Sequence, residues 1–360
     1  MMKPIGLDTF PLTVISLIKD EYHGDLDVDI DLSLSKGELC SKEHAFSFIR
    51  KLHFNKFSSE LLLKVCNNSL DNYLMNNIII DKSKRLERSK GIRFLSEILK
   101  GIDYVLIKDL QVPYVLLSDI DVLISNYIEL VKAAYVLEKE ECELFSFRLL
   151  AHPFKIMATN CKGDTFQIDL YPHPMWIRRQ VASNEDVFQT RNFRILDNLK
   201  IPVPAPPMDF YIIATHAWSH LTLSLAEALY LLKISKSLNE SDWFSIIELA
   251  YEWGTADSIF VISLILNILS ENLYGYRVVP DNILEELERI HKASNEAKKW
   301  LKGVQKLDFP LIFPTYLSPF YSSLYSFRAL RRKGLMKAIY GVLSIYLSYF
   351  ASKISKGENI

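Results

Sequence analysis

Two aspartates, Asp119 and Asp121, stand inside the apolar run LSDIDVLI, and a third, Asp169, stands inside FQIDLYP. In a β-strand, residues i and i+2 point to the same face, so Asp119 and Asp121 project together. Buried carboxylates that lie this close repel each other and lose their hydration. If the strand that carries Asp169 lies beside the first, three carboxylates converge. Oxygen ligands of this kind favour a hard divalent cation, Mg²⁺ or Mn²⁺.

Three converging carboxylates are what a two-metal phosphoryl-transfer site requires. We expect Asp119 and Asp121 to hold the cation that carries an incoming triphosphate. Asp169 would complete the second metal site and help to deprotonate the acceptor hydroxyl. All three aspartates are therefore predicted both as metal ligands and as catalytic residues. The Asp-x-Asp pair by itself is weakly specific, because such pairs also occur on solvated edges and turns.

The ordered set LIKD, LLSDIDVLI and FQIDLYP resembles the nucleotidyltransferases of the DNA polymerase beta superfamily. The resemblance rests on two acids in one apolar strand, followed after a helix and two strands by a single acid in another. It implies a nucleoside triphosphate such as ATP as donor, Mg²⁺ or Mn²⁺ as cofactor, and transfer of a nucleoside monophosphate to a hydroxyl group with release of pyrophosphate.

Where that superfamily usually has a Gly-Gly or Gly-Ser turn, this chain has Lys108 and Asp109. Lys108 is similar to the branch of uncharacterised nucleotidyltransferase family proteins in which a Lys-Gly pair is common, whereas Asp109 departs from that pattern. The resemblance implies nucleotide binding by Lys108, Asp109 and Ser118. The departure at Asp109 keeps an alternative open, in which the fold is retained as a catalytically inactive binding or scaffold protein.

The resemblance covers about residues 60 to 255. RLERSKGIRFLSEILKGIDYVLIKD is similar to the helix that leads into the lysine, and ATHAWSH, EALYLLKI and DWFSIIELAYEWG are similar to the helical domain after the core. The acceptor is not defined: a small molecule, a protein side chain and an RNA end, as in toxin-like tRNA-modifying nucleotidyltransferases, all stay open.

The elements that must position these residues follow from the apolar pattern. Residues 44–100 have apolar side chains at three- and four-residue spacing and no proline, which predicts helices. Short apolar segments from Tyr104 to Pro174 predict strands, with a helix that Asn126 caps and a turn at CKGD. The prolines of IPVPAPP, residues 201–207, predict a stiff connector. Helices follow, with Ser241 or Asp242 as one cap and Gly254 as one end.

The predicted fold class is α+β, a small mixed-sheet nucleotidyltransferase core with N-terminal helices and a C-terminal helical domain. The predicted domains are a mainly helical region at 1–100, the core at 101–200, the helical domain at 201–305, and an aromatic segment with a C-terminal amphipathic helix at 306–360.

Composition limits the function classes. Hydrophobic residues make up 49% of the 360 residues and the net charge is −1, which excludes wholesale disorder and a global basic field for nucleic acid. The scattered cysteines without a CxxC pair predict buried thiols in a cytoplasmic protein and neither a disulfide framework nor a zinc site; they are Cys40, Cys66, Cys142 and Cys161.

No transmembrane segment is predicted. The apolar stretch Ala338–Ala351 is shorter than the roughly 20 residues that a membrane span needs. It has the pattern of an amphipathic helix that packs on the protein, with a partner protein or a membrane surface as alternative contacts.

Other polar motifs have simpler interpretations. HGDLDVDIDL resembles the start of a small-molecule kinase catalytic loop, but only 22 residues precede His23, so a solvated edge strand or loop is preferred. His216 and His220 lie one helical turn apart, and we interpret them as histidines packed at a domain junction, with His216 facing the cleft as the alternative. Arg178 and Arg179 fit a solvated basic turn or a triphosphate contact. The aromatic residues 309–327 suit a core or a partner surface.

Overall fold

The structure is a computed structural model of the chain. It describes residues 6–7, 9–18, 42–66, 72–147, 155–176, 179–196, 198–290, 300–301, 306–313 and 339. HGDLDVDIDL, Arg178, almost all of the predicted C-terminal helix and residues 314–327 of the aromatic segment lie outside these residues, so those predictions stay untested. Phe309 and Phe313, in the described part of the aromatic segment, are buried in the hydrophobic core, which was one of the two alternatives.

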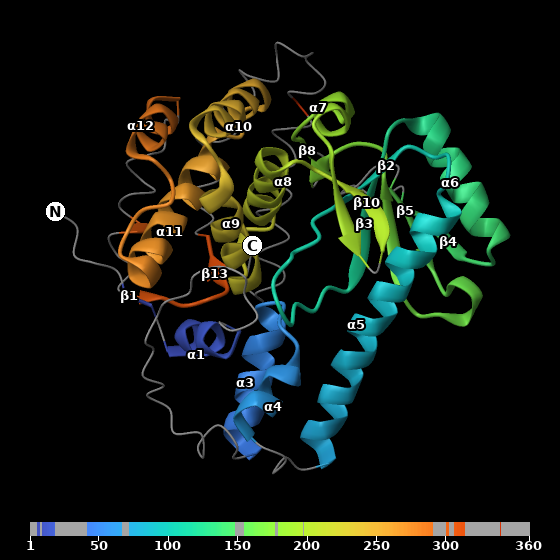
Figure 1. The fold of residues 1–360 in the computed structure, drawn as a ribbon, viewed down its shortest axis with the longest axis horizontal. Helices are drawn as coiled ribbons and strands as arrows, with labels where there is room; N and C mark the ends of the chain where they lie inside the picture. Colours follow the sequence, from blue (N-terminus) through green and yellow to red (C-terminus); the bar gives the residue numbers. More distant parts are fainter. Residues whose placement is uncertain are drawn as a thin grey trace.

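A five-stranded mixed sheet forms the centre of the molecule (Figure 1). Its order is β2-β3-β6-β5-β4, with β3 and β6 parallel and the other pairs antiparallel. The strands are β2 (Tyr104–Ile107), β3 (Asp119–Ile124), β4 (Glu143–Phe147), β5 (Lys155–Thr159) and β6 (Gln167–Tyr171). The crossover between the parallel strands contains α6 (Tyr127–Lys139), which Asn126 caps as predicted, together with β4 and β5. The predicted mixed sheet is therefore confirmed.

Alternation along the strands gives the sheet two different faces. Ile120, Val122 and Ile124 of β3 pack into one hydrophobic cluster with the helices α5 (Asn72–Ile98) and α6. Asp119 and Asp121 alternate with them and point the other way, toward the side where Leu123 joins a second cluster with the C-terminal helices. The sheet thus buries one apolar face under α5 and α6 and presents its acids on the other.

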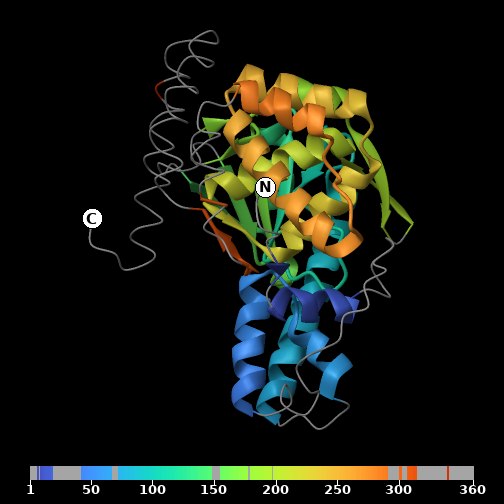
Figure 2. The same ribbon diagram turned by 90° about the vertical axis from the view of Figure 1, so that its left-hand side faces the viewer.

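The helix α5 runs close to the sheet. A Cβ atom at Gly91 would lie 2.6 Å from Ile120 Cδ1 and 2.7 Å from the ring of Phe166, so only glycine allows this approach without a shift of these two side chains. The other N-terminal helices form a lobe beside α5 (Figure 2). They are α1 (Thr9–Ile18), α3 (Lys42–Phe54), η1 (Ser59–Leu62) and α4 (Leu63–Cys66), which confirms the predicted helical region with a break after Phe54.

The C-terminal helices cover the acid-bearing face of the sheet (Figure 1). They are α8 (Pro206–Ser219), α9 (Leu225–Ser237), α10 (Glu240–Trp253), α11 (Ala256–Tyr274) and α12 (Asp281–Ile290). Asn239, and neither Ser241 nor Asp242, caps α10, while Gly254 ends it in the left-handed conformation as predicted. By length and composition α11 could span a membrane, but most of it is buried among its neighbours, as in the core helix of a globular domain.

The expected connector at 201–207 is wrong in part. Residues 199–203 form β10 (Leu199–Val203), which pairs in a hairpin with β9 (Asn192–Leu196), and Pro206 begins α8. Proline is tolerated in β10 because this strand pairs with β9 alone, and at a helix start because the missing N–H has no intrahelical partner.

The remaining short elements are β1 (Gly6–Leu7), η2 (Cys161–Gly163), β7 (Met175–Trp176), β8 (Arg179–Gln180), α7 (Asn184–Gln189), β11 (Thr222–Leu223), β12 (Lys306–Leu307) and β13 (Leu311–Ile312).

Two cysteines that we expected as thiols are joined. Cys142, just before β4, forms a disulfide with Cys161, just after β5, and both are buried. The spacing of the cysteines does not predict this bond, because the two residues come together only when β4 and β5 pair.

Reduction of this disulfide should lower the free energy of unfolding. Breaking a cross-link between residues 19 apart releases loop entropy in the unfolded chain worth about 3 kcal/mol. Urea unfolding with and without reductant measures the difference. The double variant Cys142→Ala/Cys161→Ala should be insensitive to reductant, and an unchanged midpoint for the native sequence would contradict the bond.

Candidate active site

The parallel register of β3 and β6 brings the three predicted aspartates together. Asp121 lies directly opposite Asp169, and Asp119 lies opposite Gln167. Each aspartate offers one oxygen, and these oxygens all lie within 4.8 Å of one another. Asp169 and Asp121 are buried, while Asp119 is partly exposed at the start of β3. The predicted convergence is therefore present.

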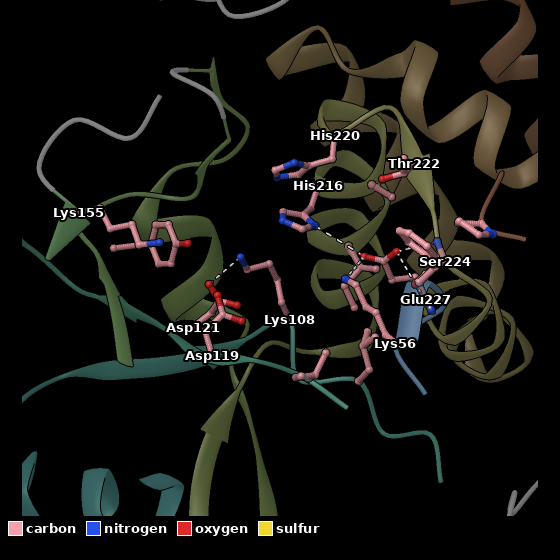
Figure 3. Close-up of a pocket in the computed structure, with 17 residues that line it drawn as sticks. Lys56, Lys108, Asp119, Asp121, Lys155, His216, His220, Thr222, Ser224 and Glu227 are labelled. Carbon is pink, nitrogen blue, oxygen red and sulfur yellow. Dashed lines mark hydrogen bonds and ion pairs between the residues drawn. The ribbon is translucent and has the colours of Figure 1, made fainter. Parts of the chain in front are cut away.

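Two lysines balance part of this negative charge. Lys108 Nζ lies 2.7 Å from Asp121 Oδ1 (Figure 3). Lys155 of β5 forms an ion pair with Asp169. Both ammonium groups also lie over the ring of Tyr171, at 5.0 and 5.1 Å from its centroid. Both ammonium groups thus contact one aromatic ring and pair with the acidic cluster.

Burial and mutual repulsion perturb these carboxylates in different directions. Burial, opposed by Lys155, raises the pKa of Asp169 to about 6. Burial also raises the pKa of Asp121, even though Lys108 opposes it. For Asp119, the attraction of Lys108 and Lys155 outweighs burial and lowers the pKa. Carboxylates that share one site commonly show pKa values shifted in opposite directions, because the charge on one disfavours ionisation of its neighbour.

The donor set fits a hard divalent cation. All three ligands are carboxylate oxygens, which suit Mg²⁺ or Mn²⁺. Asp121 Oδ1 and Asp169 Oδ2 each have a lysine ammonium group as an ion-pair partner but accept no hydrogen bond of normal geometry. A cation held by the three carboxylates would replace the lysines at these oxygens.

Lys108 follows β2 in a left-handed backbone conformation, with φ of 56°. Residues other than glycine adopt this region at a cost. The backbone therefore turns at Lys108, directly after β2. Its side chain lies against Asp121 in the candidate site.

Asp109, a predicted nucleotide contact, does not face the site. It is buried and forms ion pairs with Arg88 of α5, at 2.7 Å, and with Arg194 of β9. Burial would raise its pKa, but the two arginines lower it. Asp109 therefore links the end of β2 to α5 and β9 through ion pairs. Ser118, the third predicted contact, donates to Asp119 Oδ1 at 3.2 Å and lines a second cavity, on the α5 side of Asp119.

A cavity of about 500 Å³ opens between the sheet and the C-terminal helices. It is large enough for a small-molecule ligand. Its polar lining comes from distant parts of the chain: Lys56, Lys108, Asp119, Asp121, Lys155, Tyr171, His216, His220, Thr222, Ser224 and Glu227. Figure 3 shows the two acids with Lys108 on one side and Lys56 with Glu227 on the other. Asp169 is fully buried behind Asp121 and does not line the cavity.

Several cavity residues were missed or set aside in the sequence. His216 and His220, interpreted as packed histidines, both line the cavity. The predicted helix across them ends at Ser219, because Leu221 takes a left-handed conformation and Ser224 begins α9. Glu227 forms a capping box with Ser224 at the start of α9. This pattern accounts for a glutamate at this position without any role in the cavity, so the sequence does not identify Glu227 as a cavity residue. No motif in the sequence around Lys155 marks it as a cavity residue.

Comparison with models of protein families and with curated proteins finds no match to this chain. The motif resemblance and the site geometry therefore support a proposal about function and assign no family.

Asp121→Asn and Asp169→Asn should each remove stabilisation by Mg²⁺. A cation that binds only the folded chain adds about 2.7 kcal/mol to the free energy of unfolding at 100 times its Kd, and each variant lacks one charged ligand. Thermal unfolding over a Mg²⁺ titration measures this. Asp164→Asn, an exposed acid outside the cavity, is the matched control. Equal Mg²⁺ responses in all four proteins would contradict the metal site.

A second buried acid gives a pH prediction. Asp209 of α8 accepts a hydrogen bond from Tyr230 at 2.7 Å, and burial raises its pKa to about 7. Because the unfolded chain ionises first, this group lowers the free energy of unfolding as the pH rises from about 4 to 7. Asp209→Asn should therefore gain roughly 2–3 kcal/mol relative to the native sequence between pH 5 and pH 8, measured by urea unfolding. If the free energies of unfolding of the two proteins changed in parallel with pH, the raised pKa of Asp209 would be contradicted.

Proposed function

We propose that this protein is a metal-dependent nucleotidyltransferase that transfers a nucleoside monophosphate from a nucleoside triphosphate to a hydroxyl acceptor. The observation that carries the proposal is the trio of Asp119, Asp121 and Asp169 across two parallel strands beside a ligand-sized cavity. The order of motifs along the chain supports the same class. The acceptor oxygen would bond to the α-phosphorus as the bond from that phosphorus to pyrophosphate breaks.

The residues divide the work in this proposal. Asp119, Asp121 and Asp169 would hold Mg²⁺ or Mn²⁺, which when bound neutralises charge on the triphosphate. Lys108 and Lys155 are long and flexible, so their ammonium groups can leave the carboxylates for phosphate oxygens. Because they already border the acids, this movement would cover a short distance. Positioning and charge neutralisation would supply the rate enhancement.

A second candidate is a catalytically inactive protein that binds a nucleotide or a partner. Two observations favour it: the deepest carboxylates, Asp121 and Asp169, already have lysine partners, and Asp109 is committed to two arginines. A site whose acids are neutralised by lysines could bind a triphosphate and perform no transfer.

Label transfer tests the proposal. The protein is incubated with each α-labelled nucleoside triphosphate, Mg²⁺ or Mn²⁺, and separate pools of RNA, protein and small molecules. We expect one pool to gain label, and Asp121→Asn to reduce the transfer at least a hundredfold, because charge neutralisation at the phosphate is typically worth this much. Asparagine is preferred to alanine because it keeps a partner for Lys108. Asp164→Asn should transfer normally.

The two candidates give different results. Protection from thermal unfolding by a triphosphate with Mg²⁺, combined with no transfer to any pool, would support the inactive binding protein. Neither protection nor transfer would contradict both.

A further inference from the structure

The cavity wall opposite the aspartates has its own set of polar side chains. Lys56 comes from the loop after α3, His216 from the last turn of α8, His220 from the end of that helix, and Glu227 from the first turn of α9 (Figure 3). The metal site and its lysines make no use of these groups. They face the space that a triphosphate bound at the aspartates would leave free.

Glu227 organises this wall and is fully satisfied. Its Oε1 accepts from Lys56 Nζ at 2.7 Å, and its Oε2 accepts from the Ser224 backbone N–H at 2.9 Å and hydroxyl at 2.7 Å. It is buried, and although burial alone would raise its pKa, the attraction of Lys56 outweighs burial and lowers it. Burial alone would lower the pKa of Lys56, but Glu227 raises it. The pair is therefore ionised on both sides and has no net charge.

The two histidines add neutral polar groups. His216 Nδ1 lies 3.8 Å from Glu227 Oε1, and the His216 ring packs 4.5 Å from that of His220 and edge-on to Trp176 at 5.2 Å. Burial and the nearby charge of Lys108 lower the pKa of both imidazoles, so they are uncharged at neutral pH. Each neutral imidazole offers one donor and one acceptor.

We infer that this wall is the acceptor subsite of the proposed nucleotidyltransferase, and that it takes a small, uncharged acceptor with several hydroxyl groups, such as a sugar or polyol. The inference rests on the proposed function. Hydroxyl groups both donate and accept, which matches neutral imidazoles and a fixed Lys–Glu pair. The side chain of Ile213, which lines the cavity beside His216, suits the C–H face of a sugar ring.

Charged acceptors fit this wall less well. A phosphorylated acceptor needs a cation to spare, but Lys56 is held by Glu227, and Lys108 and Lys155 face the aspartates. A cationic amine needs a spare carboxylate, but Glu227 already accepts three hydrogen bonds. A cavity of about 500 Å³ has the size of a small-molecule site, which favours a small acceptor over a macromolecule.

Fractionation of the acceptor pool tests the inference. Small molecules from a cell lysate are separated by ion exchange into neutral, anionic and cationic fractions, and total RNA forms a fourth arm. Each is incubated with the full chain, Mg²⁺ and α-labelled nucleoside triphosphates. We expect label in the neutral fraction, and we expect unmodified hexoses or polyols supplied alone to be labelled.

Single charge changes should move this preference in opposite directions. Glu227→Gln leaves Lys56 without its ion-pair partner, while the amide oxygen of the introduced glutamine still accepts from Ser224. The ratio of label in the anionic fraction to label in the neutral fraction should therefore rise on the order of tenfold. Lys56→Gln leaves Glu227 unpaired, so the ratio of cationic to neutral acceptor should rise similarly. Lys233→Gln, on α9 outside this cavity, is the control. If Glu227→Gln does not fold, Lys56→Gln carries the test.

The outcomes separate the two proposals. Transfer to the anionic, cationic or RNA arm by the native sequence, with ratios that neither charge change alters, would overturn the acceptor assignment and leave the nucleotidyltransferase proposal standing. Absence of transfer in every arm would overturn both.

Discussion

The arrangement of this protein depends on the parallel pairing of β3 with β6. That register sets Asp121 directly opposite Asp169 and places Asp119 at the strand end, so three like charges share a small, largely buried volume. Such a cluster is unfavourable unless positive charge accompanies it. The other residues of the site supply part of that positive charge, and the cavity leaves space for a cation that would supply the remainder.

Different parts of the chain meet this electrostatic demand. The turn after β2 contributes Lys108, β5 contributes Lys155, and both ammonium groups lie over Tyr171. The N-terminal lobe and the C-terminal helices complete the opposite wall through Lys56 and Glu227. Because these segments are far apart in the sequence, the cavity exists only when the lobe, the sheet and the C-terminal helices are packed together. A hydrophobic cluster that runs from Phe10 to Phe313 holds them in place.

The sequence predicted the features that depend on local pattern. Alternation in LSDIDVLI placed its aspartates on one strand face, and an isolated acid between apolar residues located Asp169. Features that depend on distant partners were not predictable. Asp109 meets Arg194 only in the folded chain, and Cys142 meets Cys161 only when β4 and β5 pair. The position of His216 on the cavity wall was predicted only as the alternative to a packed histidine, and that of His220 was not predicted, because their spacing is equally typical of a packed helix.

The most direct test of the account is a crystal structure with Mn²⁺ and a non-hydrolysable nucleoside triphosphate, in which anomalous scattering locates the metal. The account predicts a Mn²⁺ peak bonded to carboxylate oxygens of Asp119, Asp121 and Asp169, with the ammonium groups of Lys108 and Lys155 moved onto phosphate oxygens. A nucleotide bound elsewhere, no peak between the strands, and both lysines still paired with their aspartates would contradict it.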